Sequence, residues 1–348
     1  MKENKSKSNA KNRNIKKKNV KKKKSRFKII MGFLLFEIVF TGVTAPLIAY
    51  HGPFTNVRDT LVTTAMTTLS HQWIATTFLS EEKINEIMGN QAIKTIAQDN
   101  SKSGVVIEKK NDRKILLEEV NSNKFKGYLL TINDPTRLKV GYSSQLDNGS
   151  GELTSEIAIN NDAIAAINGG GFTDKSTGEE WTGTGGSPTG LLMSNGKIVH
   201  NDLSSADEKR ETVAFRDDGT LLVGNYSLNE LQDQNVLNAV SFGPALIVNG
   251  EKTIGEGSSG GWGIAPRTAI GQKADGTILL LVIDGRQLTS SGATLKDAQD
   301  ILYENGAVTA SNLDGGSSST MYYNGEVINS PSDTLGERTV PSVIYVEK

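Results

Sequence analysis

An apolar run of 22 residues near the start of the chain, residues 29–50, constrains the fold most strongly. This length is enough to cross a bilayer as a helix. The run holds one formal charge, Glu37, and 12 of its residues are Leu, Ile, Phe or Val. Those residues favour insertion by roughly 4 to 7 kcal/mol, against a penalty of about 3 kcal/mol for one central acid. We therefore expect one transmembrane anchor at 29–50, with Glu37 protonated or paired.

The segment before this run, residues 1–28, is basic and low in complexity. It holds 14 of the 38 Lys and Arg residues and one acid, Glu3, for a net charge of +13. The other 320 residues hold 24 basic and 38 acidic side chains, a net of −14. We expect the tail to be disordered. The positive-inside rule predicts a single-pass protein of the cell membrane, with the tail cytoplasmic and the C-terminal domain extracellular.

Two alternatives exist for this N-terminal region. A cleaved signal peptide usually has a shorter basic region and an A-x-A site, and neither is found here, so an uncleaved anchor is favoured. The basic tail also resembles a nucleic-acid-binding arm. A topology determinant with affinity for anionic lipid explains it better, and we expect no nucleic-acid partner.

The counts of Cys and His exclude several kinds of site. The chain has no Cys, which excludes disulfides, Cys–zinc sites, iron–sulfur clusters and thiol nucleophiles. With only three His, a His-rich metal site is not expected, and a Ser-His-Asp triad would have to use His200. The sequence requires no cofactor, although a divalent cation on carboxylates stays possible.

The rest of the chain divides into a stalk with a linker, residues 51–114, and a larger domain, residues 115–348. Apolar residues within 55–79 are spaced loosely like a helix. Ser80 is expected to cap a short helix that ends near Gly89. The domain is predicted to be α+β, a β-rich mixed sheet with few helices, because short apolar runs alternate with turns. The expected strands include 128–132, 138–140, 163–167, 241–248 and 268–270.

The last hundred residues predict a strand, a helix and a second strand. The first strand, 277–283, stops at Asp284, and the second, 307–313, stops at Asp314. Between them Thr294 opens an amphipathic helix with a capping-box pattern. If the two strands are parallel, a right-handed crossover brings both ends to the same sheet edge, where open α/β sheets bind ligands. Asp-Gly pairs also form ordinary turns, but an acid at the end of a buried strand is costly unless it is paired or used.

Arginine and glycine residues lie close to these strand ends in the sequence. Arg267, Arg286 and Arg338 are candidates to bind a phosphate or a carboxylate, because a guanidinium group binds such groups bidentately. They could equally be surface ion pairs. The glycine-rich runs 168–171 and 314–319 could present consecutive N–H groups to an anion. A G-x-G-x-x-G pattern at 255–260 is not followed by a helix, so it does not indicate dinucleotide binding.

Five sequence blocks resemble the phosphodiester glycosidase family in their order. They are Ala-Ala-Ile-Asn-Gly-Gly at 165–170 followed by Phe172, Ser-Phe-Gly-Pro-Ala-Leu at 241–246, Pro-Arg-Thr-Ala-Ile-Gly at 266–271, Val-Ile-Asp-Gly-Arg at 282–286, and Asn-Leu-Asp-Gly-Gly-Ser-Ser at 312–318. The resemblance covers about residues 120–346. Gly171 departs from it, since many members have an aromatic residue there, and this change would widen a sugar pocket.

The resemblance implies hydrolysis of a sugar-1-phosphodiester at the anomeric C–O bond, with a cell-surface glycan or glycolipid phosphodiester as the substrate. The implied catalytic residues are Asp284, Asp314 and Arg267; which carboxylate is the acid and which the base or nucleophile stays open. The implied substrate-binding residues are Asn168, Gly169, Gly170, Phe172, Gly243, Arg286, Asn312, Gly315, Gly316, Ser317, Ser318 and Arg338.

Two other classes of function fit the sequence less well. The alternative is a non-catalytic glycan-binding, exopolysaccharide or cell-wall assembly protein, which would not require two acids and three arginines. A peptidase or esterase is disfavoured, because Ser317–Ser319 lacks a G-x-S-x-G context and a base other than His200.

Overall fold

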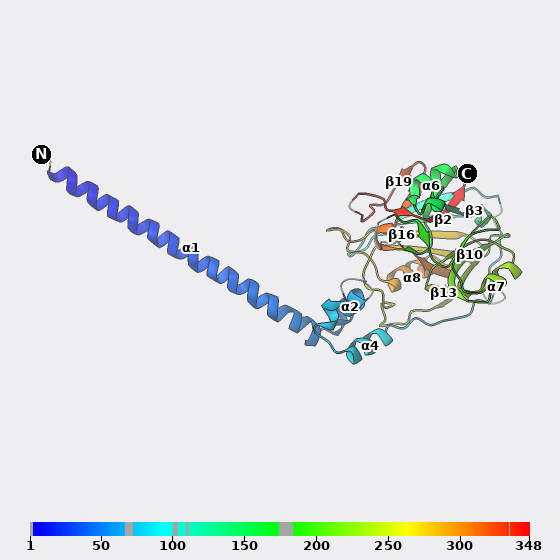
Figure 1. Cartoon of the computed structure of the whole chain (residues 1–348), viewed down its shortest axis with the longest axis horizontal. Helices are drawn as coiled ribbons and strands as arrows, with labels where there is room; N and C mark the ends of the chain where they lie inside the picture. The colour runs from blue at the N-terminus through cyan, green and yellow to red at the C-terminus, as the bar shows by residue number, and fades with distance from the viewer. Residues whose placement is uncertain (1–2, 67–71, 100–103, 109–110, 174–183, 334) are drawn as a thin grey trace.

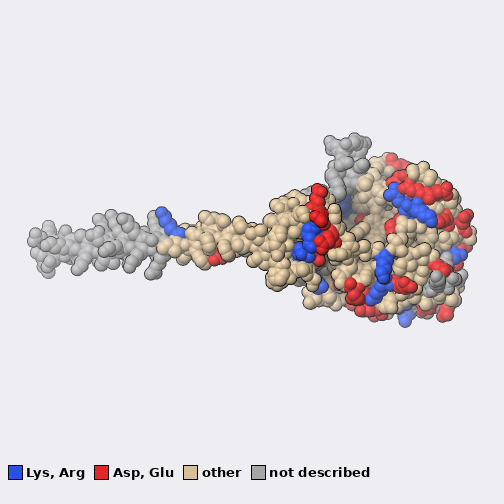
Figure 2. Space-filling model, turned by 90° about the horizontal axis from the view of Figure 1, so that it is seen from below, with Lys and Arg blue, Asp and Glu red and all other residues tan. Residues whose placement is uncertain are grey.

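A long helix and a β-rich body make up the computed structural model, which describes residues 3–66, 72–99, 104–108, 111–173, 184–333 and 335–348, with side chains from residue 27 onward. Helix α1 (Glu3–His51) extends away from the body (Figure 1). Its part Phe27–His51, with a mean hydropathy of 1.9, is long and apolar enough to cross a membrane. Figure 2 shows very few charged side chains on this part of the helix.

The expectation of a disordered tail is wrong, because α1 already begins at Glu3. Lys is a good helix former. Once the apolar run has formed a helix, each further residue adds a hydrogen bond without a new nucleation cost. The basic segment therefore continues the helix.

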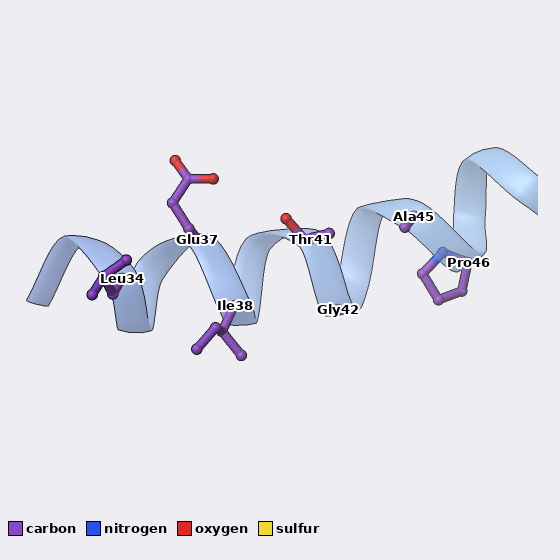
Figure 3. Close-up of a pocket in the computed structure, with 7 residues that line it drawn as sticks. All are labelled: Leu34, Glu37, Ile38, Thr41, Gly42, Ala45 and Pro46. Carbon is purple, nitrogen blue, oxygen red and sulfur yellow. The ribbon is translucent and has the colours of Figure 1, made fainter. Parts of the chain in front are cut away.

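One side of α1 is hollowed where small side chains follow larger ones (Figure 3). The hollow is lined by Leu34, Glu37, Ile38, Thr41, Gly42, Ala45 and Pro46. Glu37 projects from the helix in this view. Isolated acids within apolar spans are costly and usually acquire a partner or a function.

Among the described residues, three short helices come directly after α1 and form a small core with its last turn. They are α2 (Thr55–Met66), α3 (Trp73–Thr76) and α4 (Glu81–Gly89). Tyr50 is buried with Val62, Ala75, Ile84 and Ile87. The Ser80 side chain accepts a hydrogen bond from the backbone N–H of Lys83, as the sequence predicted. We call residues 52–91 the helical stalk.

The body contains three larger sheets and two pairs of short strands. The seven-stranded sheet has the order β1-β2-β16-β15-β17-β13-β14. Its strands are β1 (Ile115–Glu119), β2 (Gly127–Ile132), β13 (Ala245–Val248), β14 (Glu251–Lys252), β15 (Arg267–Lys273), β16 (Ile278–Ile283) and β17 (Ala307–Leu313).

Of the other sheets, two have five strands each and two have only two strands. One five-stranded sheet, β11-β10-β12-β8-β9, contains β8 (Leu191–Ser194), β9 (Lys197–Asn201), β10 (Arg210–Arg216), β11 (Leu221–Tyr226) and β12 (Val236–Ser241). The other, β19-β18-β5-β21-β3, contains β3 (Leu138–Tyr142), β5 (Ala163–Asn168), β18 (Met321–Tyr323), β19 (Glu326–Val327) and β21 (Ser342–Glu347). The pairs are β4 (Glu152–Leu153) with β20 (Thr339–Val340), and β6 (Phe172–Thr173) with β7 (Ser187–Pro188).

The three larger sheets share one apolar core. Leu280 of β16, Phe215 of β10 and Ile344 of β21 are all buried in it. The helices are few: α6 (Thr154–Asn160), α7 (Leu228–Asp233) and α8 (Leu295–Glu304), with the short 3-10 turns η1 (Pro135–Arg137), η2 (Leu146–Asn148) and η3 (Gly316–Ser318). The predicted β-rich α+β class is therefore confirmed.

One predicted strand, 241–248, is wrong, because the chain changes sheet in the middle of it. β12 ends at Ser241, a turn follows through Gly243 and Pro244, and β13 starts at Ala245 in another sheet. Proline lacks the N–H that an unbroken ladder needs. The predicted helix opening is confirmed: Thr294 caps α8 with a full capping box.

The chain between stalk and body also lies against the sheets. Lys94 N–H donates to the Thr253 carbonyl at 3.0 Å, and Val106 N–H donates to the Ala274 carbonyl at 2.8 Å. The Gln98 side chain bonds to the backbone of β11 on both sides, donating to the Leu221 carbonyl at 3.0 Å and accepting from Val223 N–H at 2.7 Å. Described residues of this linker are thus part of the packed body.

Candidate active site

Three candidate residues meet at one edge of the seven-stranded sheet. β15 lies between β16 and β17 and pairs antiparallel with both, so β16 and β17 run parallel. Ile283 is opposite Arg267, and Leu313 is opposite Thr268. Asp284 and Asp314 therefore follow the two parallel strands at the edge where β15 begins with Arg267. This is the arrangement that the strand–helix–strand pattern predicts.

Asp284 is held in a buried polar environment. Only 4% of the residue is exposed. Its Oδ1 accepts hydrogen bonds from Asn329 Nδ2 and from the backbone N–H of Ser330, each at 3.0 Å. Its Oδ2 accepts from the same Ser330 N–H at 3.2 Å. Burial raises the pKa of Asp284, and the hydrogen bonds from Asn329 and Ser330 oppose this rise.

Asp314 is less buried, and Asn168 fixes its backbone. Asn168 Nδ2 donates to the Asp314 carbonyl at 2.5 Å, while Asp314 N–H donates to the Gly169 carbonyl at 3.3 Å. The Asn168 Oδ1 accepts from Thr268 Oγ1 at 2.8 Å and from Thr320 N–H at 3.2 Å. Asn168 is fully buried, so it connects the ends of β5, β15 and β17 rather than facing a ligand.

The glycines after Asn168 serve close packing. A Cβ at Gly169 would lie 2.7 Å from Ser342 Oγ, and one at Gly170 would lie 2.9 Å from Val240 Cβ. Their N–H groups donate to the Ser342 carbonyl at 2.9 Å and to Ser342 Oγ at 3.2 Å. Gly171 N–H donates to the Ser241 carbonyl at 3.0 Å. The expected backbone anion site at 168–171 is therefore wrong, because the protein itself uses these donors.

Arg267 is buried and holds loop backbone in place. Its Nε donates to the Ala293 carbonyl at 3.0 Å, and its Nη2 donates to the carbonyls of Trp262 at 3.0 Å and Gly263 at 2.6 Å. Burial, followed by the nearby positive charge of Arg286, lowers the pKa of Arg267 to about 10. Within the described chain these three bonds use Nε and Nη2, and none is made by Nη1.

Arg286 differs from Arg267 in being exposed. Its backbone is left-handed, with φ at 59°, which is uncommon for a residue other than Gly and is often found at functional sites. Its Nη2 would lie 3.4 Å from a Cβ built on Gly316, so its guanidinium lies beside the η3 turn. The described residues offer this guanidinium no hydrogen bond or ion pair.

Arg338 approaches the same turn from another direction. Its Nη1 donates to Ser317 Oγ at 3.1 Å, and its guanidinium lies 4.9 Å from the centre of the Phe172 ring. The neighbours Gly316 and Ser317 thus each lie beside a different arginine, Arg286 and Arg338. Gly315 packs closely on Pro266, where an added Cβ would lie 2.9 Å from the carbonyl oxygen. Ser318 is buried within η3.

Gly243 and Asn312 lie close to a carboxyl that the sequence did not single out. Asn312 Nδ2 donates to the Gly243 carbonyl at 2.9 Å, and a Cβ on Gly243 would lie 2.7 Å from Glu211 Oε2. Burial raises the pKa of Glu211. Its Oε2 is a buried acceptor without a hydrogen-bond partner among described atoms. Glu211 belongs to a run of charged residues, 207–211, which is typical of the exposed start of a strand. The sequence therefore gives no signal that distinguishes Glu211 from its neighbours.

A metal centre has little support in the part of the chain that the structure describes. There, no three side chains of the types His, Cys, Asp and Glu gather in a group that could hold an ion. His200 lies on β9, in another sheet, 3.8 Å from Asp202. The candidate site thus consists of two carboxylates, three arginines and the η3 turn.

Comparison of the chain with known proteins identifies its family. Residues 161–347 match the phosphodiester glycosidase family. The chain belongs to that family. It is 31% identical over 221 residues to the SPbeta prophage-derived uncharacterized protein YomE of Bacillus subtilis, covering 61% of this chain and 31% of that protein.

The other relatives have named activities. N-acetylglucosamine-1-phosphodiester alpha-N-acetylglucosaminidase of Mus musculus is 28% identical over 232 residues, covering 60% of this chain and 41% of the mouse protein. The chain thus spans less than half the length of these curated relatives. The zebrafish enzyme's catalytic domain, whose structure is described as auto-inhibited by a pro-peptide, has a similar fold, with a TM-score of 0.59 and 22% identity over 74% of this chain and 95% of that one.

Proposed function

We propose that this protein is a membrane-anchored extracellular hydrolase that cleaves the glycosidic bond of a sugar-1-phosphodiester on a cell-surface glycan or glycolipid. Family membership supports a hydrolase of this class. The observation that carries the proposal is the meeting of Asp284 and Asp314 at one sheet edge with Arg286, which is exposed and makes no hydrogen bond or ion pair with the described residues. Anchoring through residues 29–50 rests on the length and hydropathy of α1.

The chemistry of such a substrate fits these residues. The leaving group is a phosphate monoester, whose developing charge needs cations, and Arg286 and Arg338 both lie beside η3 to supply them. Retaining and inverting glycosidases both use a pair of carboxyl groups. Because burial raises the pKa of Asp284, we assign it the proton-donating role, and we assign the less buried Asp314 the role of base or nucleophile.

In this mechanism the other named residues hold the reacting groups. Asn168 and Gly169 fix the Asp314 backbone, Gly170 packs on Ser342 and Val240, and Asn312 fixes the turn at Gly243. Phe172 packs under Arg338 and is half-buried, and we expect the sugar to contact the part of its ring that stays exposed. Arg267 acts as a positioning residue, because most of its hydrogen bonds go to loop carbonyls.

The proposal is tested with the methyl diester of N-acetylglucosamine-1-phosphate and the full chain in detergent. The measured quantity is the release of free N-acetylglucosamine. We expect turnover by the wild-type protein and at least ~10²-fold less by Asp314→Asn. The rival function is a non-catalytic glycan-binding or assembly protein. Binding of the diester without any release of sugar would support that rival and contradict the proposal.

A further inference from the structure

Three large apolar side chains stand exposed on the loops that carry the candidate arginines. Leu288 is 108% exposed and follows Arg286 by two residues. Leu335 is 93% exposed and precedes Arg338 by three. Trp262 is 40% exposed, and its carbonyl holds Arg267. Single exposed leucines need no explanation, but three such side chains around one polar site indicate a surface that meets something apolar. We call these three residues the apolar rim.

The loops that bear the apolar rim are held in place around Asp284. Gln287 Nε2 donates to the Ser330 carbonyl at 2.7 Å, so the loop of Leu288 is fastened to the loop that leads to Leu335. Ser330 N–H in turn donates to Asp284. The Trp262 ring is positioned by an edge contact with Phe242, 6.0 Å between ring centres. The loop of Leu288 and the ring of Trp262 are therefore held in place at the site.

The apolar rim lies near the membrane end of the body. Thr64 of α2 packs against Gly263, next to Trp262: a Cβ on Gly263 would lie 2.6 Å from Thr64 Cα. The last turn of α1 packs on the same helix through Tyr50 and Val62. Since α2 has 12 residues, its length is only about 18 Å. Figure 1 shows α2 between the end of α1 and the body, and β19, which leads into the loop of Leu335, on the side from which α1 extends.

We propose that the apolar rim rests on the outer surface of the membrane and that the substrate is a lipid-linked sugar-1-phosphodiester. This inference rests on the proposed function. Trp side chains prefer the membrane interface, and Leu side chains the hydrocarbon below it. A phosphodiester at headgroup depth would meet Arg286 and Arg338, while its lipid chain stays among Leu288 and Leu335. The sugar then lies towards Asp284 and Asp314.

Membrane contact is tested first without reference to activity. Because the chain has no Cys, Leu288→Cys or Leu335→Cys carries a single polarity-sensitive fluorophore. We expect a blue shift when the full chain moves from detergent into liposomes of a zwitterionic phospholipid. The control is Leu237→Cys, which is 36% exposed at the start of β12 and should show no shift. Equal spectra at the rim and control positions would overturn the proposal.

Substrate class is tested on two diesters of N-acetylglucosamine-1-phosphate, one with a long-chain alcohol in liposomes and one with methanol in solution. We expect the double variant Leu288→Ser/Leu335→Ser to lose at least about 10-fold in kcat/KM on the long-chain diester, because each leucine loses its apolar contact. Its kcat/KM on the methyl diester should stay unchanged, as should both values for Leu237→Ser. Equal losses on both diesters, or a wild-type protein that does not prefer the long-chain diester, would overturn the inference but leave the proposed function standing. Failure to hydrolyse either diester would overturn both.

Discussion

At the scale of single residues, the carboxyl groups of Asp284 and Asp314 differ in burial. We therefore expect substitutions of the two residues to have different effects. Asp284 is buried and its folded pKa is raised, so the folded protein holds its proton more tightly than the unfolded chain does. The stability that this group contributes is therefore present below its unfolded pKa and is lost as pH rises through the folded value.

Asp284→Asn removes this charge while retaining the size and one acceptor oxygen. We expect this variant to keep its Tm at neutral pH, to lose stability relative to wild type on acidification, and to lose at least ~10²-fold in turnover. Thermal unfolding at neutral and acidic pH checks the first two expectations; a Tm difference that does not vary with pH would contradict them.

The arginines provide a second prediction at this scale. Arg267 holds three backbone carbonyls while buried, so Arg267→Lys should cost about 3 kcal/mol in the free energy of unfolding, by the loss of hydrogen bonds from a charged group. The matched variant Arg286→Lys loses no such bond, and it should raise KM for the diester with no change in stability. Denaturant unfolding and steady-state kinetics on both variants check this. The sequence predicted a role in substrate binding or catalysis for Arg267, because no local pattern shows that the carbonyls of Trp262, Gly263 and Ala293 accept its hydrogen bonds.

At the scale of elements, the strand–helix–strand unit could be predicted because its signals are local. Apolar runs, a capping box at Thr294 and a terminal glycine fix β16, α8 and β17, and the sheet edge follows from topology. Other features are determined by tertiary contacts, which leave no local signal in the sequence. These include the use of the 169–171 N–H groups by Ser342 and Ser241, the change of sheet at Pro244, and the position of Glu211 beside Gly243.

The linker between the stalk and the body is expected to stabilise the body through its hydrogen bonds. The described residues of the linker bond to β11, to the loop of Thr253 and to the turn at Ala274 and Asp275, through Lys94, Gln98, Val106 and Glu108. A chain that starts at residue 93 should therefore have a higher Tm than one that starts at residue 111, although residues 93–108 lie outside the proposed domain boundary at 115. Calorimetry on the two truncated chains measures the difference. Equal Tm values would mean that these contacts add nothing to stability.

At the scale of the whole molecule, the charge asymmetry predicts orientation. The +13 tail should remain in the cytoplasm, with residues 51–348 outside. Protease added to intact cells from which the wall has been removed should digest the body and leave a fragment that contains the tail. Protection of the body in the same cells, with digestion only after lysis, would contradict the extracellular placement.

The central claim concerns which bond breaks, and hydrolysis in isotopically labelled water tests it most directly. If the two carboxyl groups act at the anomeric carbon, water adds to the sugar, and the heavy oxygen is found in the released N-acetylglucosamine. Mass spectrometry of both products distinguishes this from attack at phosphorus. The account predicts label in the sugar and none in the phosphate monoester. Label in the phosphate product would contradict it.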